Sequence, residues 1–187
     1  MTVLTLLLCR LGEALTAPFG LAQLAIVLEL IGLYGLLAIP LGLASGLLRP
    51  PWRLLTWLAW LRLGASLLLL PALLEEGLFR VLLLPRSLLE LEPMAQAGWV
   101  ALSVGLFVLY HPLSGWLWYP EGRGLFQQAR FVVPCSLLGL VCVIAYASTG
   151  SLWAPVLIHW FTLLIWLGPC DGARDLTDRR SARRTAR

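Results

Sequence analysis

The sequence predicts an all-α integral membrane protein with about five transmembrane helices plus interfacial helices, and three observations support this fold class. Hydrophobic residues make up 59% of the 187 residues and charged residues only 13%, against about 45–50% and 25% in soluble domains. Five apolar stretches reach the length of about 20 residues that a membrane-spanning helix needs. Few ionisable side chains interrupt them. This composition excludes a soluble enzyme, a disordered protein and a disulfide-stabilised scaffold.

The predicted spans follow one another with short connections. Glu29 and Pro40 interrupt the first span, whereas the fourth span carries no charge. A continuous helix from residue 54 to residue 85 would be about 48 Å long, which exceeds a hydrocarbon core of about 30 Å. We therefore expect a break near Gly64. The predicted spans are residues 21–47, 66–85, 98–118, 131–149 and 152–169.

Two segments, which precede the first and the second predicted span, are predicted to lie at the membrane surface. Residues 50–63 combine Trp and Arg side chains, a mixture typical of the headgroup layer. Residues 1–20 are apolar but contain Arg10 and Glu13, and are compatible with a signal-like stretch, an interfacial helix or the start of the first span. No convincing cleavage site follows, so we expect them to stay in the mature chain. Residues 1–170 are thus predicted to form one membrane-embedded domain.

Residues 171–187 form an Arg-rich tail. The tail has no interleaved aromatic residues that could stack on bases, so we expect no nucleic-acid partner. We expect it to contact anionic lipid of the bilayer instead. The distribution of Arg favours a cytoplasmic C-terminus and an outside N-terminus, and we expect a bacterial inner (cytoplasmic) membrane. The oligomeric state stays open.

The ionisable side chains inside the predicted spans are candidate functional residues, because charges are costly in the hydrocarbon core. Glu76 and Arg80 have the spacing that favours an ion pair on a helix. Glu75 lies about 100° around the helix from Glu76 and is left free to bind or deprotonate another group. Counted from the cytoplasmic helix ends, Glu75, His111 and His159 share a depth of about 10–15 Å. We expect them to meet in one layer.

A carboxylate and an imidazole in a dry cavity can activate water, with the carboxylate as general base. A second imidazole can stabilise the developing oxyanion. Peptide hydrolysis inside a membrane needs such a polar cavity, and we expect the active-site helices to bundle around one. A zinc site with Glu75, His111 and His159 as ligands is an alternative, and Ser114 near His111 is a weaker serine-nucleophile alternative.

Structural roles compete with these functions. A single membrane His is more often a helix–helix hydrogen-bond partner, and a buried Glu–Arg pair more often contributes to packing. Phe107 and His111 lie one turn apart and could pack ring against ring. A transporter that uses Glu29 and Glu75 is a further alternative, although we detect no inverted repeat.

Three segments carry motifs in a fixed order. Glu75–Arg80 has the pattern E-E-x-x-x-R, Phe107–His111 has the pattern F-x-x-x-H, and Ser136–His159 is a third block that ends on a histidine. Together they resemble the CAAX-processing and bacteriocin-processing (CPBP, or Abi) family of intramembrane proteases. The resemblance covers residues 66–168.

The resemblance implies an all-helical protease of the glutamic type. In that family the first Glu and the histidine of the second motif activate water, which implies this role for Glu75 and His111. The last histidine, His159, would help to stabilise the oxyanion. Glu76 and Arg80 would support the site. The family was once described as metal-dependent, which is consistent with the zinc alternative.

One position departs from the family pattern. The family usually has Asn, or a similar polar residue, four positions after the last histidine, where this chain has Leu163. Thr162 is adjacent but about 100° around the helix, and it is a candidate substitute. Thr162 and Phe107 therefore join the supporting residues of the predicted site.

The leading hypothesis is an intramembrane endopeptidase that hydrolyses a peptide or a membrane-tethered protein with Glu/His-activated water. It would use no cofactor, with zinc as the alternative. The second hypothesis is a non-catalytic CPBP-like membrane protein that acts as a partner-binding or maturation factor, and Leu163 is its main argument.

Overall fold

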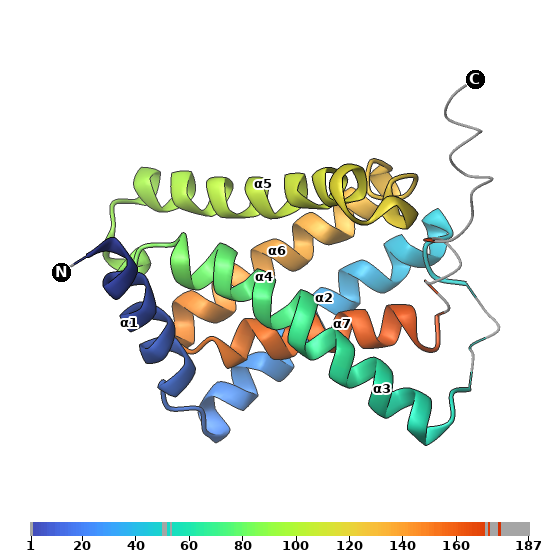
Figure 1. Cartoon of the computed structure of the whole chain (residues 1–187), viewed down its shortest axis with the longest axis horizontal. Helices are drawn as coiled ribbons and strands as arrows, with labels where there is room; N and C mark the ends of the chain where they lie inside the picture. The colour runs from blue at the N-terminus through green and yellow to red at the C-terminus, as the bar shows by residue number, and fades with distance from the viewer. Residues whose placement is uncertain (1, 50–51, 53, 171, 173–175, 177–187) are drawn as a thin grey trace.

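The structure, a computed structural model, describes residues 2–49, 52, 54–170, 172 and 176, and its regular elements there are all helices (Figure 1). Within this part of the chain, four helical stretches are long and apolar enough to cross a membrane, and α7 (Trp153–Leu167) is a shorter apolar helix. The predicted fold class is confirmed, and the chain is a multi-pass membrane protein. The four long stretches are α2 (Leu21–Ser45), Trp57–Leu82, α5 (Pro93–Leu117) and α6 (Ala129–Thr149).

The second stretch is one continuous helix, so the predicted break near Gly64 is wrong. It consists of α3 (Trp57–Leu67), η1 (Leu68–Leu73), α4 (Leu74–Glu76) and η2 (Gly77–Leu82), where η1 and η2 are π-helical. Gly64 is buried inside it, and its carbonyl accepts a hydrogen bond from Trp160 Nε1 at 2.8 Å. The stretch runs obliquely to α5 in Figure 1. A tilted helix can place more residues in the bilayer than an upright one, so a length that exceeds the thickness of the hydrocarbon core does not require a break.

The N-terminal segment forms a separate helix, α1 (Val3–Thr16), at one end of the bundle (Figure 1). Residues 17–20 separate it from α2, so it is not the start of the first span. Its backbone contacts the start of α7, because Ala14 O accepts a hydrogen bond from Leu152 N at 2.9 Å. Trp153 Nε1 also donates to Leu15 O at 3.0 Å.

α6 is the central helix and packs against α2, α5 and α7. Close approach to α5 depends on Gly139, where a Cβ atom would lie 3.1 Å from Phe107 Cδ1. The helix ends at Gly150, whose positive φ of 66° suits glycine. α7 follows and ends before Gly168. At about 1.5 Å per residue, α7 is shorter than the predicted span.

The predicted tail lies almost entirely outside the described residues, because only Gly172 and Leu176 of residues 171–187 are described. Residues 50, 51 and 53 of the predicted surface segment also lie outside them. The four cysteines are described and none forms a disulfide: Cys9, Cys135, Cys142 and Cys170.

Candidate active site

Two adjacent carboxylates lie on α4, between the π-helical turns of η1 and η2. Glu75 and Glu76 are both buried, and consecutive helix positions point them to different neighbours. π-Helical turns occur frequently at functional sites. The local sequence therefore presents two carboxylates to the interior of a bundle where charge is costly.

Glu76 lies between two groups that can carry positive charge. Arg80 Nε is 2.9 Å from Glu76 Oε2, so the ion pair expected from the helical spacing is present. His159 Nδ1 donates to Glu76 Oε1 at 2.7 Å. The side chains of Glu76 and Arg80 are 0% exposed and that of His159 is 2% exposed. Glu76 thus links the helix that carries the paired carboxylates to α7.

Arg80 is held on its other sides by α5 and α6. Its Nη2 donates to Gly139 O at 3.2 Å, and its guanidinium carbon lies 4.5 Å from the centroid of the Phe107 ring. These contacts favour one orientation of the guanidinium group. Arg80 therefore offsets the charge of Glu76 without reaching Glu75, as the helical geometry predicted.

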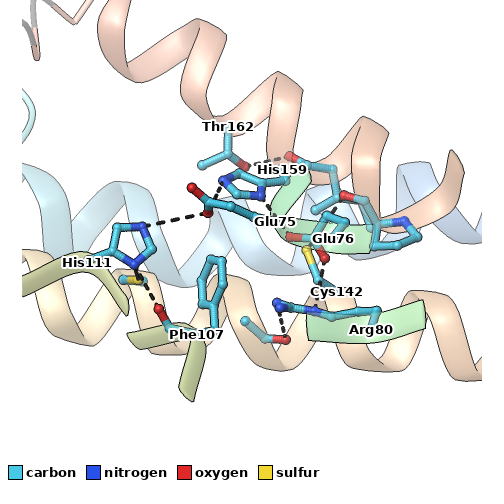
Figure 2. Close-up of polar contacts among 12 residues, drawn as sticks. Glu75, Glu76, Arg80, Phe107, His111, Cys142, His159 and Thr162 are labelled. Atoms are coloured by element: carbon cyan, nitrogen blue, oxygen red, sulfur yellow. Dashed lines mark hydrogen bonds and ion pairs between the residues drawn. The ribbon is translucent and has the colours of Figure 1, made fainter. Parts of the chain in front are cut away.

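Glu75 lies between the imidazoles of His111 and His159 (Figure 2). Its Oε2 atom is 3.9 Å from His111 Nε2 and 3.9 Å from His159 Nε2. The same buried atom accepts no hydrogen bond from the residues that the structure describes. The three side chains expected to meet in one layer are thus brought together.

The orientation of each imidazole is set by its Nδ1 atom. His111 Nδ1 lies 2.9 Å from Phe107 O, and a carbonyl only accepts, so Nδ1 carries the proton. His159 Nδ1 likewise carries a proton, which it donates to Glu76 Oε1. Both Nε2 atoms are therefore directed toward Glu75.

The predicted ring packing of Phe107 is also present. Its ring contacts His111 edge to face with a centroid distance of 5.0 Å, and contacts His159 with a centroid distance of 5.6 Å. The ring is fully buried. Packing and a role at the site are therefore compatible, because the Phe107 ring packs against both imidazoles.

A cavity of about 590 Å³ reaches the site. His111 and His159 are in its wall, but most of the lining is apolar, so the expected polar character is limited to a few groups. The other lining residues of α5, α6 and α7 are Phe107, Phe131, Pro134, Cys135, Leu138, Phe161, Thr162, Leu163, Ile165 and Trp166. Those of α2 and the loop after it are Ile31, Gly32, Tyr34, Gly35, Leu36, Ala38, Ile39, Pro40, Leu47 and Leu48.

Two hydroxyl groups near the site are already engaged. Thr162 Oγ1 donates to Ile158 O at 2.9 Å, within its own helix. Ser114 Oγ donates to His111 O at 2.8 Å, a backbone acceptor and not an imidazole. This geometry does not give Ser114 the histidine partner that a serine nucleophile needs.

A protein-family model matches the middle and C-terminal parts of the chain. The family described as type II CAAX prenyl endopeptidase Rce1-like matches residues 52–165. The chain belongs to the Rce1-like family. This confirms the resemblance to the CPBP proteases and supports a function of the CAAX-protease kind. No curated protein matches the chain, and no solved structure does.

The matched segment of this Rce1-like protein contains all three motifs, whereas α1 and α2 lie outside it. α2 nevertheless supplies one wall of the cavity. Glu29 lies on its exposed side, so the structure does not bring Glu29 and Glu75 together as the transporter alternative required.

The zinc alternative requires donor side chains that converge on one point. Among the residues that the structure describes, no three His, Cys, Asp or Glu side chains form a group that could hold a metal ion. Glu75 Oε2 lies 3.9 Å from each Nε2 atom, and in this geometry the three side chains do not form such a group.

Sequence reasoning missed two groups at the site of this Rce1-like protein. Gly139 supplies a backbone carbonyl to Arg80, and a glycine in an apolar span carries no signal of that role. Cys135 lies in the cavity wall with Sγ 3.8 Å from His111 Nδ1. Both belong to α6, which has no charged residue in its apolar part.

Proposed function

We propose that the chain is an intramembrane endopeptidase that hydrolyses a peptide bond of a membrane-associated protein or peptide, without a cofactor. The observation that carries this proposal is the position of Glu75. Its carboxylate is buried, accepts no hydrogen bond at Oε2 from the described residues, and lies 3.9 Å from the Nε2 atoms of two histidines. A separation of this size is suited to a bridging water molecule.

Glu75 and His111 would activate that water together. Because His111 Nδ1 donates its proton to Phe107 O, the Nε2 lone pair is an acceptor. A water molecule that donates to both Nε2 and the Glu75 carboxylate directs its own lone pair toward a substrate carbonyl. As the water oxygen bonds to the carbonyl carbon, one proton moves to Glu75, which acts as general base. Glu75 would then give this proton to the amide nitrogen as the C–N bond breaks, so that the amine leaves and a carboxylic acid remains.

His159 would act on the other side of the tetrahedral intermediate. Its Nδ1–H is committed to Glu76, so Nε2 can donate only when the ring is an imidazolium. With Arg80 and protonated His159 opposite ionised Glu75 and Glu76, the buried cluster is neutral overall. Nε2–H can then donate to the oxyanion, where low polarity strengthens the contact.

The cavity would bind the apolar part of the substrate. Its volume of about 590 Å³ and its mainly apolar lining suit a membrane-tethered peptide. The family description names prenyl endopeptidases, and an apolar substituent next to the scissile bond fits the same lining. The scissile carbonyl would lie at the two imidazoles.

The second candidate function is a non-catalytic partner-binding or maturation factor. Leu163 favours it, because this side chain lines the cavity without a hydrogen-bond donor. The hydroxyl of Thr162 donates to Ile158 O, so it would have to leave this acceptor to replace the missing donor.

The deciding experiment compares new peptide N-termini in cells that carry the wild-type chain or Glu75→Gln, at matched membrane levels. Glu75→Gln preserves side-chain size and removes the base. We expect cleavage products only with the wild type and with Glu92→Gln, a control at an exposed position before α5. Products that persist in Glu75→Gln would overturn the glutamate mechanism. Identical termini in all strains would favour the non-catalytic function.

We also propose a cytoplasmic C-terminus and a bacterial inner-membrane location. Arg10 contacts Leu82 O and Leu84 O at the end of the Trp57–Leu82 stretch, whereas Arg62 lies near the start of that stretch. Arg is enriched on the cytoplasmic side of membrane proteins. Reporter fusions after residue 187 and before residue 2 test this orientation, and an outward C-terminal reporter would contradict it. The Arg residues at the expected cytoplasmic ends of the helices are Arg49, Arg62, Arg123 and Arg130.

A further inference from the structure

Glu29 is an intramembrane carboxylate on the outer side of α2. It lies eight positions after Leu21, the first residue of the helix, or about 12 Å along the axis. Its side chain is exposed, and no described residue pairs with it. Acidic residues in membrane spans usually face the bundle interior and have a partner. An outward-facing Glu29 therefore indicates that another molecule supplies its partner.

Glu29 lies on a regular row of exposed positions, which we call the α2 seam. Successive members are alternately three and four residues apart, the spacing with which one helix packs along another. The members, all exposed, are Ala22, Ala25, Glu29, Gly32, Leu36, Ile39 and Leu43.

The seam has room for a closely packed helix. Ala22, Ala25 and Gly32 are small, and small residues allow the backbones of membrane helices to approach. A Cβ atom added at Gly32 would meet nothing within 4 Å. The close approach would also bring a donor from the other helix within reach of Glu29.

Charge argues against a second copy of this chain on the seam. Two copies in one membrane share an orientation, so a two-fold pair would place Glu29 opposite Glu29. Two facing carboxylates repel unless one is protonated. A helix with a Lys, Arg or amide side chain at the same depth is complementary instead.

The seam is continuous with the cavity. Gly32, Leu36 and Ile39 belong to the seam and also line the cavity that contains His111 and His159. A helix on the seam is therefore positioned to deliver the chain that continues from it into the site. This continuity favours a substrate over a distant adaptor as the occupant.

We infer that the α2 seam docks the transmembrane helix of a membrane-anchored protein substrate, and that Glu29 binds a basic or amide side chain of that helix. The inference rests on the proposed function and adds the class of substrate. Because α2 lies outside residues 52–165, this docking is a property of the part of the chain beyond the family match.

The test measures binding separately from cleavage. The full chain carrying Glu75→Gln is reconstituted in liposomes with a labelled single-span Leu/Ala peptide. The peptide has one Lys at a depth of about 12 Å from the surface opposite the Arg-rich tail, or Leu at that position. Energy transfer between chain and peptide should show that the Lys peptide binds about tenfold more tightly than the Leu peptide. In Glu29→Leu the two peptides should bind equally.

Two glycine variants supply the matched control. Gly32→Leu fills the seam and should weaken binding of both peptides. Gly98→Leu adds the same side chain at an exposed site of α5 that also has nothing within 4 Å, and should leave binding unchanged. Gly98 belongs to α5 and not to α2, and it does not line the cavity.

Two results would overturn the inference. If the Lys and Leu peptides bind equally to the chain that retains Glu29, the carboxylate does not contribute to docking. Glu29-dependent energy transfer between two differently labelled copies of the chain would show that the seam holds a second copy. Both results are independent of the cleavage experiment, because the base is already absent from the protein used.

Discussion

His159 Nδ1 donates a hydrogen bond to Glu76 Oε1 at 2.7 Å, and this contact joins α7 to the helix that carries the paired carboxylates. It assigns different tasks to two adjacent Glu residues. Glu76 holds His159 and is offset by Arg80 at 2.9 Å. Glu75 has neither contact and is directed toward both Nε2 atoms. The site therefore depends on a structural carboxylate as much as on the proposed base.

Glu76 and Arg80 should behave as a coupled pair in unfolding experiments. Glu76→Leu or Arg80→Met alone leaves a buried charge without its partner, which costs about 3–5 kcal/mol. The double variant removes both charges and should be less destabilised than the sum of the single variants. Reversible unfolding in detergent–lipid micelles measures the free energy of unfolding of the wild type, the two single variants and the double variant. Strict additivity would show that the pair does not interact.

The positions after His159 should respond unequally to substitution. Thr162→Val should change turnover by less than about threefold, because the Thr162 hydroxyl already donates to Ile158 O. Leu163→Asn adds a donor in the cavity wall and should raise kcat by about tenfold at some cost in stability. Cleavage rates of one substrate at matched protein levels test both. A large loss of turnover in Thr162→Val would indicate that the Thr162 hydroxyl donates a hydrogen bond to the oxyanion.

Chelators should not reduce activity. The proposed reaction uses Glu75 and His111 for water activation, and the described His, Cys, Asp and Glu residues form no group suited to a metal ion. We expect unchanged cleavage by purified protein after treatment with 1,10-phenanthroline and dialysis. Loss of activity that added Zn²⁺ restores would instead support the zinc alternative. A non-chelating phenanthroline isomer is the matched control.

Arg10 should stabilise the end of the carboxylate-bearing helix. Its Nη1 donates to Leu82 O at 3.3 Å and its Nη2 donates to Leu84 O, where the helix has no further backbone donors. Arg10→Gln should therefore lower the free energy of unfolding by about 1.5–3 kcal/mol. Arg62→Gln, at an exposed position of α3, should have less effect. Equal losses in a thermal unfolding assay would show that Arg10 has no special role.

Local helical geometry made part of the site predictable from sequence. The pairing of Glu76 with Arg80 follows from a spacing of four residues, and the separate direction of Glu75 follows from the 100° turn between neighbours. The contact of Phe107 with His111 follows from the same spacing. Each of these relationships lies within one helix, and the structure shows all three.

The break expected near Gly64 failed for a different reason. Helix length was compared with membrane thickness as if the helix were upright, whereas Trp57–Leu82 is continuous. Tilt is set by packing against neighbouring helices, here including the hydrogen bond from Trp160 to Gly64 O. No pattern within residues 54–85 contains that information.

The sequence alone determined that this is an all-helical membrane protein with three ordered motifs and few ionisable groups in its spans. Apolar length and local spacing suffice for those conclusions, because they depend on hydration and on the geometry of a single helix. Only the tertiary structure decided that His159 is bound by Glu76 while Glu75 faces both imidazoles, and that α2 supplies one wall of the cavity. Those contacts join helices distant in the chain, and they are fixed by how the helices pack.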